Sequence, residues 1–324
     1  MSLLEVSALN VSFRTETNPI KVVSNLSFDI KESEVFGLVG ESGCGKSLTA
    51  LSVMGILPPN AYAEGSINFN GKDLLKLDRE SMRRLRGKEL AMIFQEPMTS
   101  LNPVLTVGYQ ISEVITTHLG LSKKDAVGKA LDLLRDVKIP SPEIRIKEYP
   151  HQMSGGMRQR IMIAMAIACN PSLLIADEPT TALDVTIQAQ ILELLQGLRE
   201  KRKMSILLIT HDLGIIAENA KRVAIMYAGR IVELTDAEEL FRNPRHPYTM
   251  GLLDSLPKEK GRPLKPIPGS VPHPGRLPAG CKFSDRCGFV IPSCKDREPD
   301  LRATSETGNA PVHLARCIRA EEIK

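Results

Sequence analysis

The stretch VFGLVGESGCGKSLTALSVMGIL, residues 35–57, decides the fold of this chain. It starts with an apolar run typical of a buried strand, continues with a glycine-rich loop and ends in a pattern typical of a helix. The loop GESGCGKS, Gly40 to Ser47, matches the phosphate-binding pattern G-x-x-x-x-G-K-[ST], and it does so in the strand–loop–helix context that the pattern requires. We therefore expect an α/β domain that binds a nucleotide.

The residue types of this loop suit a phosphate ligand. Glycines let the backbone curl so that successive N–H groups point at phosphate oxygens. We expect Lys46 to reach the β- and γ-phosphates and Ser47 to ligate Mg²⁺, while the start of the following helix adds a favourable dipole. The residues expected to touch the nucleotide are Gly40, Glu41, Ser42, Gly43, Cys44, Gly45, Lys46, Ser47 and Leu48.

A pair of carboxylates ends a second apolar run, LLIADEP, residues 173–179. Asp177 stands at the end of the expected strand, where a carboxylate can hold Mg²⁺ through water. Glu178 follows directly and is placed to activate an attacking water. Acidic pairs at strand ends also serve as helix caps, so the hydrolytic interpretation depends on the phosphate loop.

The rest of the chain alternates apolar runs with helical patterns. AMIFQ, SLLIADE and SILLITH are typical of buried strands, whereas KKDAVGKALDLLRDV, GMRQRIMIAMAIA and TIQAQILELLQGLREKR are typical of helices. This alternation predicts a P-loop α/β domain over residues 1–245 with a mostly parallel core sheet. Period-two patterns in the first 35 residues and in GSINFNGKDL add a small antiparallel layer, and residues 96–168 are expected to form an inserted helical subdomain.

The composition changes towards the C-terminus. Eleven of the 22 prolines lie from Pro247 onward, and proline at this density disfavours helices and central strands. Residues 246–324 are therefore expected to form an irregular extension without a core of its own.

Charge and composition exclude some classes of partner. The net charge of +4 is small, and aromatic residues make up only 4% of the chain with no Trp, which disfavours a nucleic-acid stacking platform. The N-terminal residues lack the basic and apolar pattern of a signal peptide, and no uncharged segment is long enough to cross a bilayer. We expect a cytoplasmic protein with reduced thiols.

Further motifs between and after these two centres carry a family resemblance. MSGGMRQR (153–160), TALD (181–184), THD (210–212) and FQEP (94–97), taken together with the phosphate loop, resemble the ATP-binding cassette of ABC transporters over about residues 3–240. The family signature is usually L-S-G-G-Q. Here Met153 and Met157 replace its first and last residues while the central Ser-Gly-Gly remains.

The resemblance implies a role for each motif. Phe13 would stack on adenine, Gln95 would sense Mg²⁺ and the attacking water, and His211 would contact the γ-phosphate. Ser154, Gly155 and Gly156 would bind the γ-phosphate of an ATP held by a partner subunit, and Asp184 would lie near the dimer seam. Two cassettes would thus clamp two ATP molecules, and hydrolysis would release the clamp.

The subfamily is also indicated by longer stretches. FQEPMTSLNP, ADEPTTALDVTIQAQI, NPRHPYTMGLLDSLP and PAGCKFSDRC resemble ATPase subunits of bacterial dipeptide and oligopeptide importers, whose relatives also import nickel or metal chelates. The resemblance implies three kinds of partner protein: a second homologous ATPase, two integral-membrane permeases and an extracytoplasmic solute-binding protein. It also implies that this chain is located at the cytoplasmic face of the inner membrane. Two other classes compete: a cassette ATPase that acts outside transport, on DNA or ribosomes, and a redox enzyme built around the clustered cysteines, for which the C-terminal segment shows no substrate site.

Four cysteines crowd into the proline-rich extension with the spacing Cys-x5-Cys-x6-Cys-x22-Cys: Cys281, Cys287, Cys294 and Cys317. In a reducing compartment, metal ligation would staple a segment that lacks a core. Zinc sites usually place pairs of ligands two to four residues apart, and wider gaps suit a cluster. The importer ATPases that this chain resembles carry an iron–sulfur centre in this region, which implies [4Fe–4S], with zinc as the first alternative and cysteines that bind no metal as the second.

Overall fold

The computed structural model describes residues 2–95, 100–181, 183–256, 266–304 and 312–323. The chain divides into two compact units, each of which is described here by itself. Unit 1 comprises Lys31–Glu34 and Lys76–Leu208. Unit 2 comprises Ser2–Ile30, Val35–Leu75 and Ile209–Lys324.

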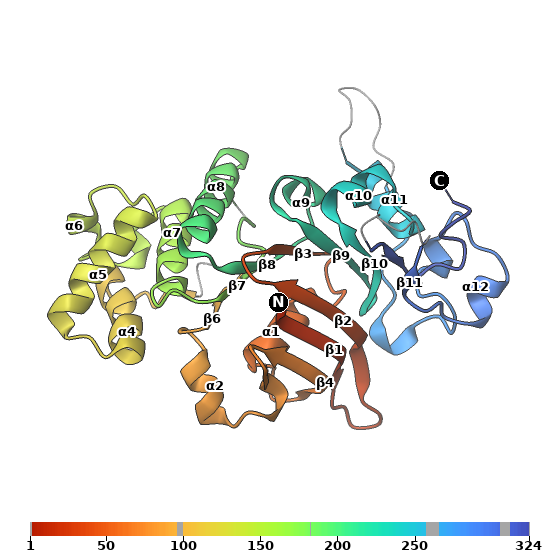
Figure 1. The fold of residues 1–324 in the computed structure, drawn as a ribbon, viewed down its shortest axis with the longest axis horizontal. Coiled ribbons are helices and arrows are strands. Elements are labelled where there is room, and N and C mark those ends of the chain that lie inside the picture. Colours follow the sequence, from red (N-terminus) through yellow and green to blue (C-terminus); the bar gives the residue numbers. More distant parts are fainter. Residues whose placement is uncertain (1, 96–99, 182, 257–265, 305–311, 324) are drawn as a thin grey trace. The chain divides into compact units, whose positions relative to one another are not determined.

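Unit 1 is mainly helical and carries a short run of parallel strands (Figure 1). Its strands follow the order β8-β7-β6, and β6 pairs with β7 in parallel. Its elements are α2 (Arg79–Leu85), β6 (Leu90–Ile93), α4 (Val107–Leu119), α5 (Lys123–Asp136), α6 (Pro142–Arg145), η2 (Pro150–Gln152), α7 (Gly155–Ala166), β7 (Leu173–Asp177), α8 (Val185–Arg202) and most of β8 (Ser205–Thr210).

Unit 2 contains two sheets (Figure 1). One sheet has the order β2-β1-β4-β5, and the strands of the other follow the order β11-β12-β10-β9-β3. The elements are β1 (Ser2–Phe13), β2 (Ile20–Lys31), β3 (Val35–Val39), α1 (Lys46–Met54), β4 (Ala61–Phe69), β5 (Lys72–Asp73), η1 (Leu74–Lys76), α9 (Leu213–Asn219), β9 (Arg222–Tyr227), β10 (Arg230–Asp236), α10 (Ala237–Arg242), α11 (Pro247–Asp254), η3 (Pro274–Arg276), η4 (Ser284–Arg286), α12 (Ser293–Asp296), β11 (Arg302–Ala303) and β12 (Leu314–Ala315).

The apolar runs form the expected buried strands. All residues of β3, β7 and β8 are buried, and β3 pairs with β9 in parallel. β1 and β4 pair antiparallel, so the period-two segments form the expected separate layer. The predicted α/β class, with mainly parallel core strands and a small antiparallel layer, is therefore confirmed.

The helices begin close to where the sequence patterns begin. Ser122 caps α5, Ser154 caps α7 and Asp184 caps α8, and in each case the side chain accepts a hydrogen bond from a backbone N–H of the first turn. α4 and α5 pack against each other and against α7 within unit 1. The helical stretch expected from residue 96 begins outside the described residues, because 96–99 are not described.

Two expectations for individual elements were wrong. AMIFQ does not continue as a buried strand to its end: β6 stops at Ile93 and Phe94 is 41% exposed. The proline-rich extension was expected to lack regular helices, yet α11 forms eight residues of α-helix. Its proline, Pro247, occupies the first helical position, where its fixed φ suits the helix and its missing N–H costs no hydrogen bond.

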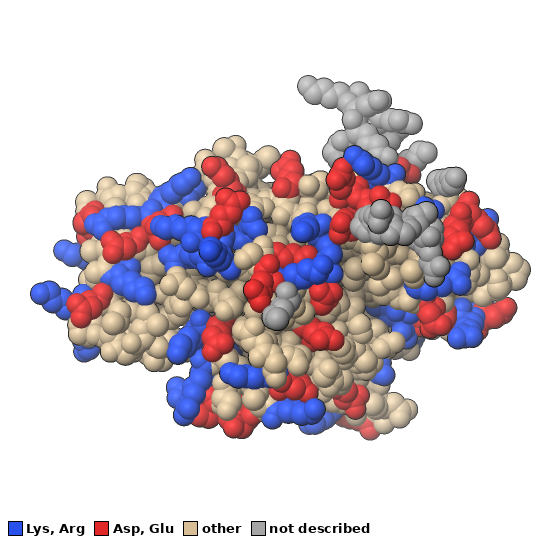
Figure 2. All heavy atoms as spheres, in the orientation of Figure 1, with Lys and Arg blue, Asp and Glu red and all other residues tan. Residues whose placement is uncertain are grey.

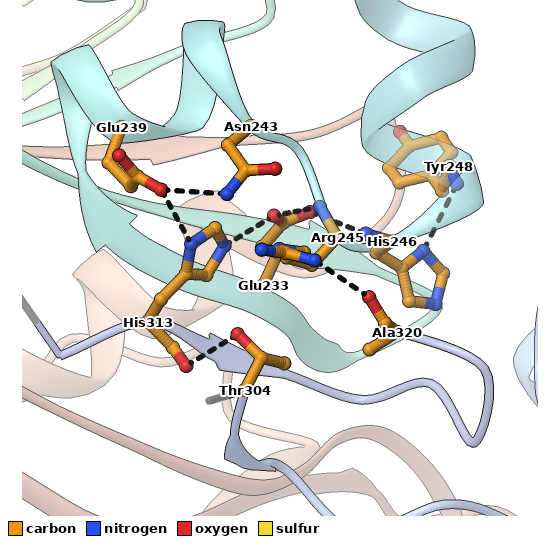
Figure 3. A network of polar contacts seen from close by, with 9 residues as sticks. All are labelled: Glu233, Glu239, Asn243, Arg245, His246, Tyr248, Thr304, His313 and Ala320. Atoms are coloured by element: carbon orange, nitrogen blue, oxygen red, sulfur yellow. Dashed lines mark hydrogen bonds and ion pairs between the residues drawn. The ribbon is translucent and has the colours of Figure 1, made fainter. Parts of the chain in front are cut away.

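The end of the extension joins the larger sheet of unit 2. β12 pairs antiparallel with β10, and Arg316 N donates to Val232 O at 2.8 Å. Glu233, fully buried on β10, lies at the centre of the polar network in Figure 3: Arg245 N donates to its Oε1 at 2.6 Å, and His246 N donates to its Oε2 at 2.9 Å. His313 Nε2, from the segment that leads into β12, lies 2.7 Å from Oε1. One carboxylate thus connects three segments that are far apart in sequence.

None of the described helices combines the length and the hydropathy that crossing a lipid bilayer requires. On the face drawn in Figure 2, Lys and Arg side chains lie among Asp and Glu side chains. This mixture agrees with the small net charge.

Candidate functional site

The phosphate loop of unit 2 joins β3 to α1 and packs closely against other strands. Gly43 and Gly45 have φ of 80° and 108°, in the left-handed region that favours glycine. A Cβ built on Gly40 would lie 2.2 Å from Met226 O, and one on Gly45 would lie 2.9 Å from Val23 Cγ2. Side chains are therefore excluded at these positions, and the loop backbone stays close to the ends of β9 and β2.

Lys46 is held across this loop. Its Nζ donates to Gly40 O at 2.7 Å and to Glu41 O at 3.1 Å, and the residue is only 5% exposed. α1 starts at Lys46 after Gly45, and no side chain caps its first N–H groups. The first N–H groups of α1 form the positive end of the helix dipole, and the Lys46 ammonium group adds a full positive charge next to it. Phosphate groups bind at helix N-termini of this kind.

Cys44 stands at one of the four unspecified positions of the loop pattern and is buried, with 1% exposure. Burial raises the pKa of its thiol, although the charge of Lys46 acts in the opposite direction. Its carbonyl oxygen accepts a hydrogen bond from Gly229 N at 3.0 Å. Cys44 therefore helps to fix the loop as a neutral, packed side chain.

In unit 1, the parallel pairing of β6 with β7 brings two predicted residues together. Ile93 and Ala176 are paired, so Gln95 and Glu178 both follow the same edge of the sheet. Gln95 Nε2 donates to Glu178 Oε2 at 3.1 Å, and Thr181 Oγ1 donates to the same oxygen at 2.8 Å. The structure thus brings Gln95 and Glu178, which belong to different motifs, into contact.

The backbone at the carboxylate pair is unusual. Asp177 ends β7 and is 4% exposed, whereas Glu178 is half-buried with φ of 46°. A left-handed conformation costs a non-glycine residue about 1–3 kcal/mol, and such strain tends to occur at functional sites. The turn allows Asp177 to remain inside the sheet while the Glu178 carboxylate reaches Gln95.

The signature residues lie at the exposed start of α7. Ser154 and Gly155 are exposed, and Ser154 Oγ accepts a hydrogen bond from Met157 N at 3.3 Å. A Cβ on Gly156 would lie 3.0 Å from Ile187 Cγ2 on α8. The glycines thus give an open helix N-terminus that other atoms can approach closely. Asp184 is exposed and its Oδ1 accepts from Ile187 N at 2.9 Å, so it caps α8.

The two remaining predicted side chains of the cassette belong to unit 2. Phe13 is the last residue of β1, is half-buried and pairs with Ala61 of β4. His211 follows β8 and is exposed, and Asp212 next to it caps α9 by accepting from Gly214 N at 2.7 Å.

The four cysteines of the extension line one small cavity. Cys281, Cys287, Cys294 and Cys317 surround it together with apolar side chains that include Phe283, Phe289 and Ile318. All four thiols are free. Burial raises the pKa of Cys281 and of Cys317 to about 11, and it also raises the pKa of Cys287. The segments carrying these residues are tied directly, because Cys281 N donates to Cys294 O at 2.8 Å.

The arrangement of these thiols differs from that expected for one metal ion. Among the described residues, no group of three or more His, Cys, Asp or Glu side chains is placed to hold such an ion. The expected clustering of the four cysteines around one cavity is therefore present, whereas a metal-ligand grouping is not found in the part of the chain that the structure describes.

Three side chains near these sites were not expected from the sequence. Gln159 on α7 donates through Nε2 to Pro179 O at 2.6 Å, which ties the signature helix to the turn after Glu178. Tyr248 and Arg286, from the extension, contact Glu41 of the phosphate loop. They lie 207 and 245 residues from Glu41 in sequence, and no motif spacing links them to it.

Comparisons with known proteins agree with this geometry. The family described as "ABC transporter" matches residues 23–181, and the family described as "Oligopeptide/dipeptide transporter, C-terminal region" matches residues 232–294. The chain is 52% identical to a dipeptide transport ATP-binding protein of Haemophilus influenzae, with 93% of this chain and 92% of that protein covered. It is 50% identical to a dipeptide transport ATP-binding protein of Escherichia coli, with 97% of both covered.

A solved structure shares the architecture as well. The dimeric structure of a bacterial ABC transporter cassette matches with a TM-score of 0.65 and 25% identity, and the match covers 72% of this chain and 98% of that cassette.

Proposed function

Because this chain belongs to the ATP-binding subunits of ABC transporters, in the oligopeptide and dipeptide branch, we propose that it hydrolyses ATP to drive import of dipeptides or oligopeptides. One observation carries this proposal: the sequence is 50–52% identical to two dipeptide transport ATP-binding proteins over more than nine tenths of the chain. The match of residues 232–294 to the peptide-transporter C-terminal region supports peptides over nickel or metal chelates as the solute.

The proposed nucleotide site starts from the phosphate loop. The N–H groups of Gly43 to Leu48 and the ammonium group of Lys46 would bind the phosphates, and Phe13 would stack on the adenine ring. The close packing of Gly40 and Gly45 against Met226 and Val23 supports this role, because it holds the loop backbone in one position.

The magnesium ion and the attacking water involve the other motifs. Ser47, Gln95 and Asp177 would hold Mg²⁺, directly or through water, and oxygen donors of this kind suit it. Bound Mg²⁺ neutralises charge that develops on the phosphates. Glu178 would accept a proton from the attacking water while Gln95 orients it, which the 3.1 Å contact between these two side chains supports. His211 would contact the γ-phosphate.

The exposed signature suggests a second subunit. The open N-terminus of α7, with Ser154, Gly155 and Gly156, would bind the γ-phosphate of ATP held by a homologous ATPase, and Asp184 would lie near that seam. The complete importer would add two permeases and an extracytoplasmic solute-binding protein. This chain would then sit as a peripheral protein on the cytoplasmic face of the inner membrane.

We assign the cysteine cavity to a structural [4Fe–4S] cluster. Zinc would draw its sulfur ligands to about 2.3 Å from one centre, and a four-iron cluster, which is larger, suits four thiols spread around a cavity. The charge of the metal would also favour the thiolate forms of Cys281 and Cys317, whose pKa values burial raises to about 11. Anaerobically purified protein should be brown and contain iron and sulfide. Colourless protein with one stoichiometric zinc would contradict the assignment.

One experiment tests the hydrolytic and transport roles together. The chain is reconstituted with its permeases, and ATP hydrolysis and uptake of a labelled dipeptide are measured for the parent protein and for Glu178→Gln. The variant should bind ATP but lose turnover, since the loop is intact and the base is gone. A matched control is Glu193→Gln, an acidic residue on α8 outside the proposed site. Hydrolysis by Glu178→Gln at the parental rate would refute the role of Glu178, and uptake of nickel but not of dipeptide would refute the solute.

A further inference from the structure

The acidic side chain of the phosphate loop is held by an arginine from the cysteine segment. Arg286 Nη1 lies 2.9 Å from Glu41 Oε1, and Arg286 Nη2 donates to Glu41 Oε2 at 3.2 Å. The guanidinium group therefore engages both carboxylate oxygens. Its side chain is 6% exposed and that of Glu41 is 31% exposed, so the pair is shielded from most of the screening that weakens surface ion pairs.

Arg286 is fixed by further contacts. Its Nε donates to Pro268 O at 2.8 Å. The guanidinium carbon lies 5.7 Å from the ring centroid of Tyr227 and 5.9 Å from that of Phe283, within the range of cation–π contacts. These contacts hold the arginine in place independently of Glu41. The ion pair with Glu41 therefore costs little additional side-chain entropy.

A second link reaches the same loop residue. Glu41 N donates to Tyr248 Oη at 3.0 Å. Tyr248 is fully buried on α11, and its ring lies 4.7 Å from Tyr227 and 5.4 Å from Phe283 between centroids. Both the backbone and the side chain of Glu41 are therefore bonded to residues of the extension.

Arg286 belongs to the turn that carries two of the cysteines. Cys287 follows it directly, and the turn closes through Ser284 N donating to Cys281 O at 3.0 Å and Arg286 N donating to Phe283 O at 3.0 Å. The position of the guanidinium group is consequently set by the shape of the cysteine segment.

From these contacts we propose that Arg286 is a positioning residue for nucleotide binding, which makes the cysteine segment a working part of the ATP site. Its role is to hold the Glu41 carboxylate aside and to neutralise it. Without Arg286, an uncompensated negative charge would remain in a loop that binds a polyanion, and ATP binding would weaken. The inference rests on the proposed assignment of Gly40–Ser47 to ATP, and it does not depend on which metal the cysteines hold.

The test is a double-mutant cycle on Arg286 and Glu41 in the full-length chain. Binding of Mg-ATP is measured by calorimetry for the parent, Arg286→Gln, Glu41→Gln and the double variant. We expect Arg286→Gln to weaken binding about tenfold, the size of a partly shielded unit charge near the ligand. In the Glu41→Gln background the same Arg286→Gln change should weaken binding by less than about threefold, because the carboxylate that would be left unpaired is absent.

Two controls separate this role from general effects. Arg297→Gln removes another arginine of the extension, which is 85% exposed and pairs with Asp300, and it should leave ATP binding unchanged. Steady-state hydrolysis should show a raised KM for Arg286→Gln with little change in kcat, whereas a folding defect would lower the active fraction and hence kcat. If Arg286→Gln does not fold, Arg286→Lys replaces it. The lysine ammonium lacks the planar fork with which Arg286 bonds both carboxylate oxygens while its Nε bonds Pro268 O, so about threefold weaker binding is expected.

The outcomes distinguish this inference from the proposed function. Lys46→Ala should abolish ATP binding, and if it does not, the assignment of the loop to ATP is itself wrong. If Lys46→Ala abolishes binding while Arg286→Gln, or Arg286→Lys in its place, binds ATP like the parent, only the role of Arg286 is overturned. An Arg286→Gln change that weakens binding as much in the Glu41→Gln background as in the parent would likewise overturn the charge argument.

Discussion

Replacing Glu233 with glutamine should loosen the end of the extension from β10. The carboxylate is fully buried, and it accepts backbone hydrogen bonds from Arg245 at 2.6 Å and His246 at 2.9 Å, with His313 Nε2 at 2.7 Å (Figure 3). Glutamine keeps one oxygen of the two but places an NH₂ group opposite a donor. A hydrogen bond to a charged group contributes about 1.5–3 kcal/mol, and a buried donor left without a partner costs about 1–3 kcal/mol.

Together these terms predict that Glu233→Gln lowers the local opening free energy by about 3 kcal/mol, close to the range measured for breaking buried charge pairs. Hydrogen exchange followed by mass spectrometry measures this directly on peptides that cover β10 and β12. Since about 1.4 kcal/mol is a factor of ten, exchange there should accelerate by roughly a hundredfold.

Glu239→Gln is the matched control for this experiment. Its carboxylate also approaches His313, at 3.8 Å from Nδ1, but it is 30% exposed. We expect a change below about 1 kcal/mol, as for other solvated pairs. Equal exchange rates in Glu233→Gln and the parent would refute the view that this carboxylate holds the extension in place.

Three further outcomes are expected. Gly40→Ala should abolish ATP binding while the chain stays folded, because the new Cβ would lie 2.2 Å from Met226 O and force the loop to move. Calorimetry measures the ATP binding, and circular dichroism shows whether the chain is folded. His246→Asn should make the free energy of unfolding depend less on pH at acidic pH. Burial lowers the pKa of His246 in the folded state to about 3, from its usual value of 6.5. Between these values the folded state keeps the imidazole neutral, whereas the unfolded chain takes up a proton. Parental stability should thus fall by up to about 1.4 kcal/mol per pH unit as pH drops from about 6.5 towards 3, measured by urea unfolding, and the asparagine still offers an acceptor to Tyr248 N. Ile225→Ala on buried β9 should cost about 2–5 kcal/mol in urea unfolding through the cavity it leaves, and Ile225→Val markedly less.

Much of the fold could be predicted because its signals are local. The stretch 35–57 contains a strand, its loop and the start of a helix in one contiguous segment, and the structure forms β3, the loop and α1 there. Helix starts were predictable for the same reason, since caps such as Ser122 and Asp184 stand directly before the apolar pattern. Gln95 and Glu178 were each predicted from their own motif, whereas their contact depends on the parallel pairing of β6 with β7, which the sequence did not predict.

The rest depended on long-range contacts that no sequence pattern marks. Glu233 stands between Val232 and Leu234 in β10, and only the folded chain brings it to His313, 80 residues later. Arg286 stands in a cysteine motif, which drew attention to metal binding and away from Glu41. α11 could not be predicted from the density of prolines in the extension, because that density does not say where each proline stands. Pro247 occupies the first helical position, which is compatible with a helix.

The link between Glu41 and Arg286 has a consequence for how the protein is made. The two residues are 245 positions apart, and ribosomes add about 5–20 residues per second. The phosphate loop therefore emerges roughly 10 to 50 seconds before its arginine has been synthesised. For most of that interval β9 and the later motifs are also still to be made; once Tyr227 has been added, Arg286 lies 59 residues further on, about 3 to 12 seconds at that rate. If Arg286 acts as proposed, the nascent cassette would bind ATP weakly during this shorter delay. Translation that stops before the cysteine turn would leave a cassette with every nucleotide-binding motif and an unshielded Glu41.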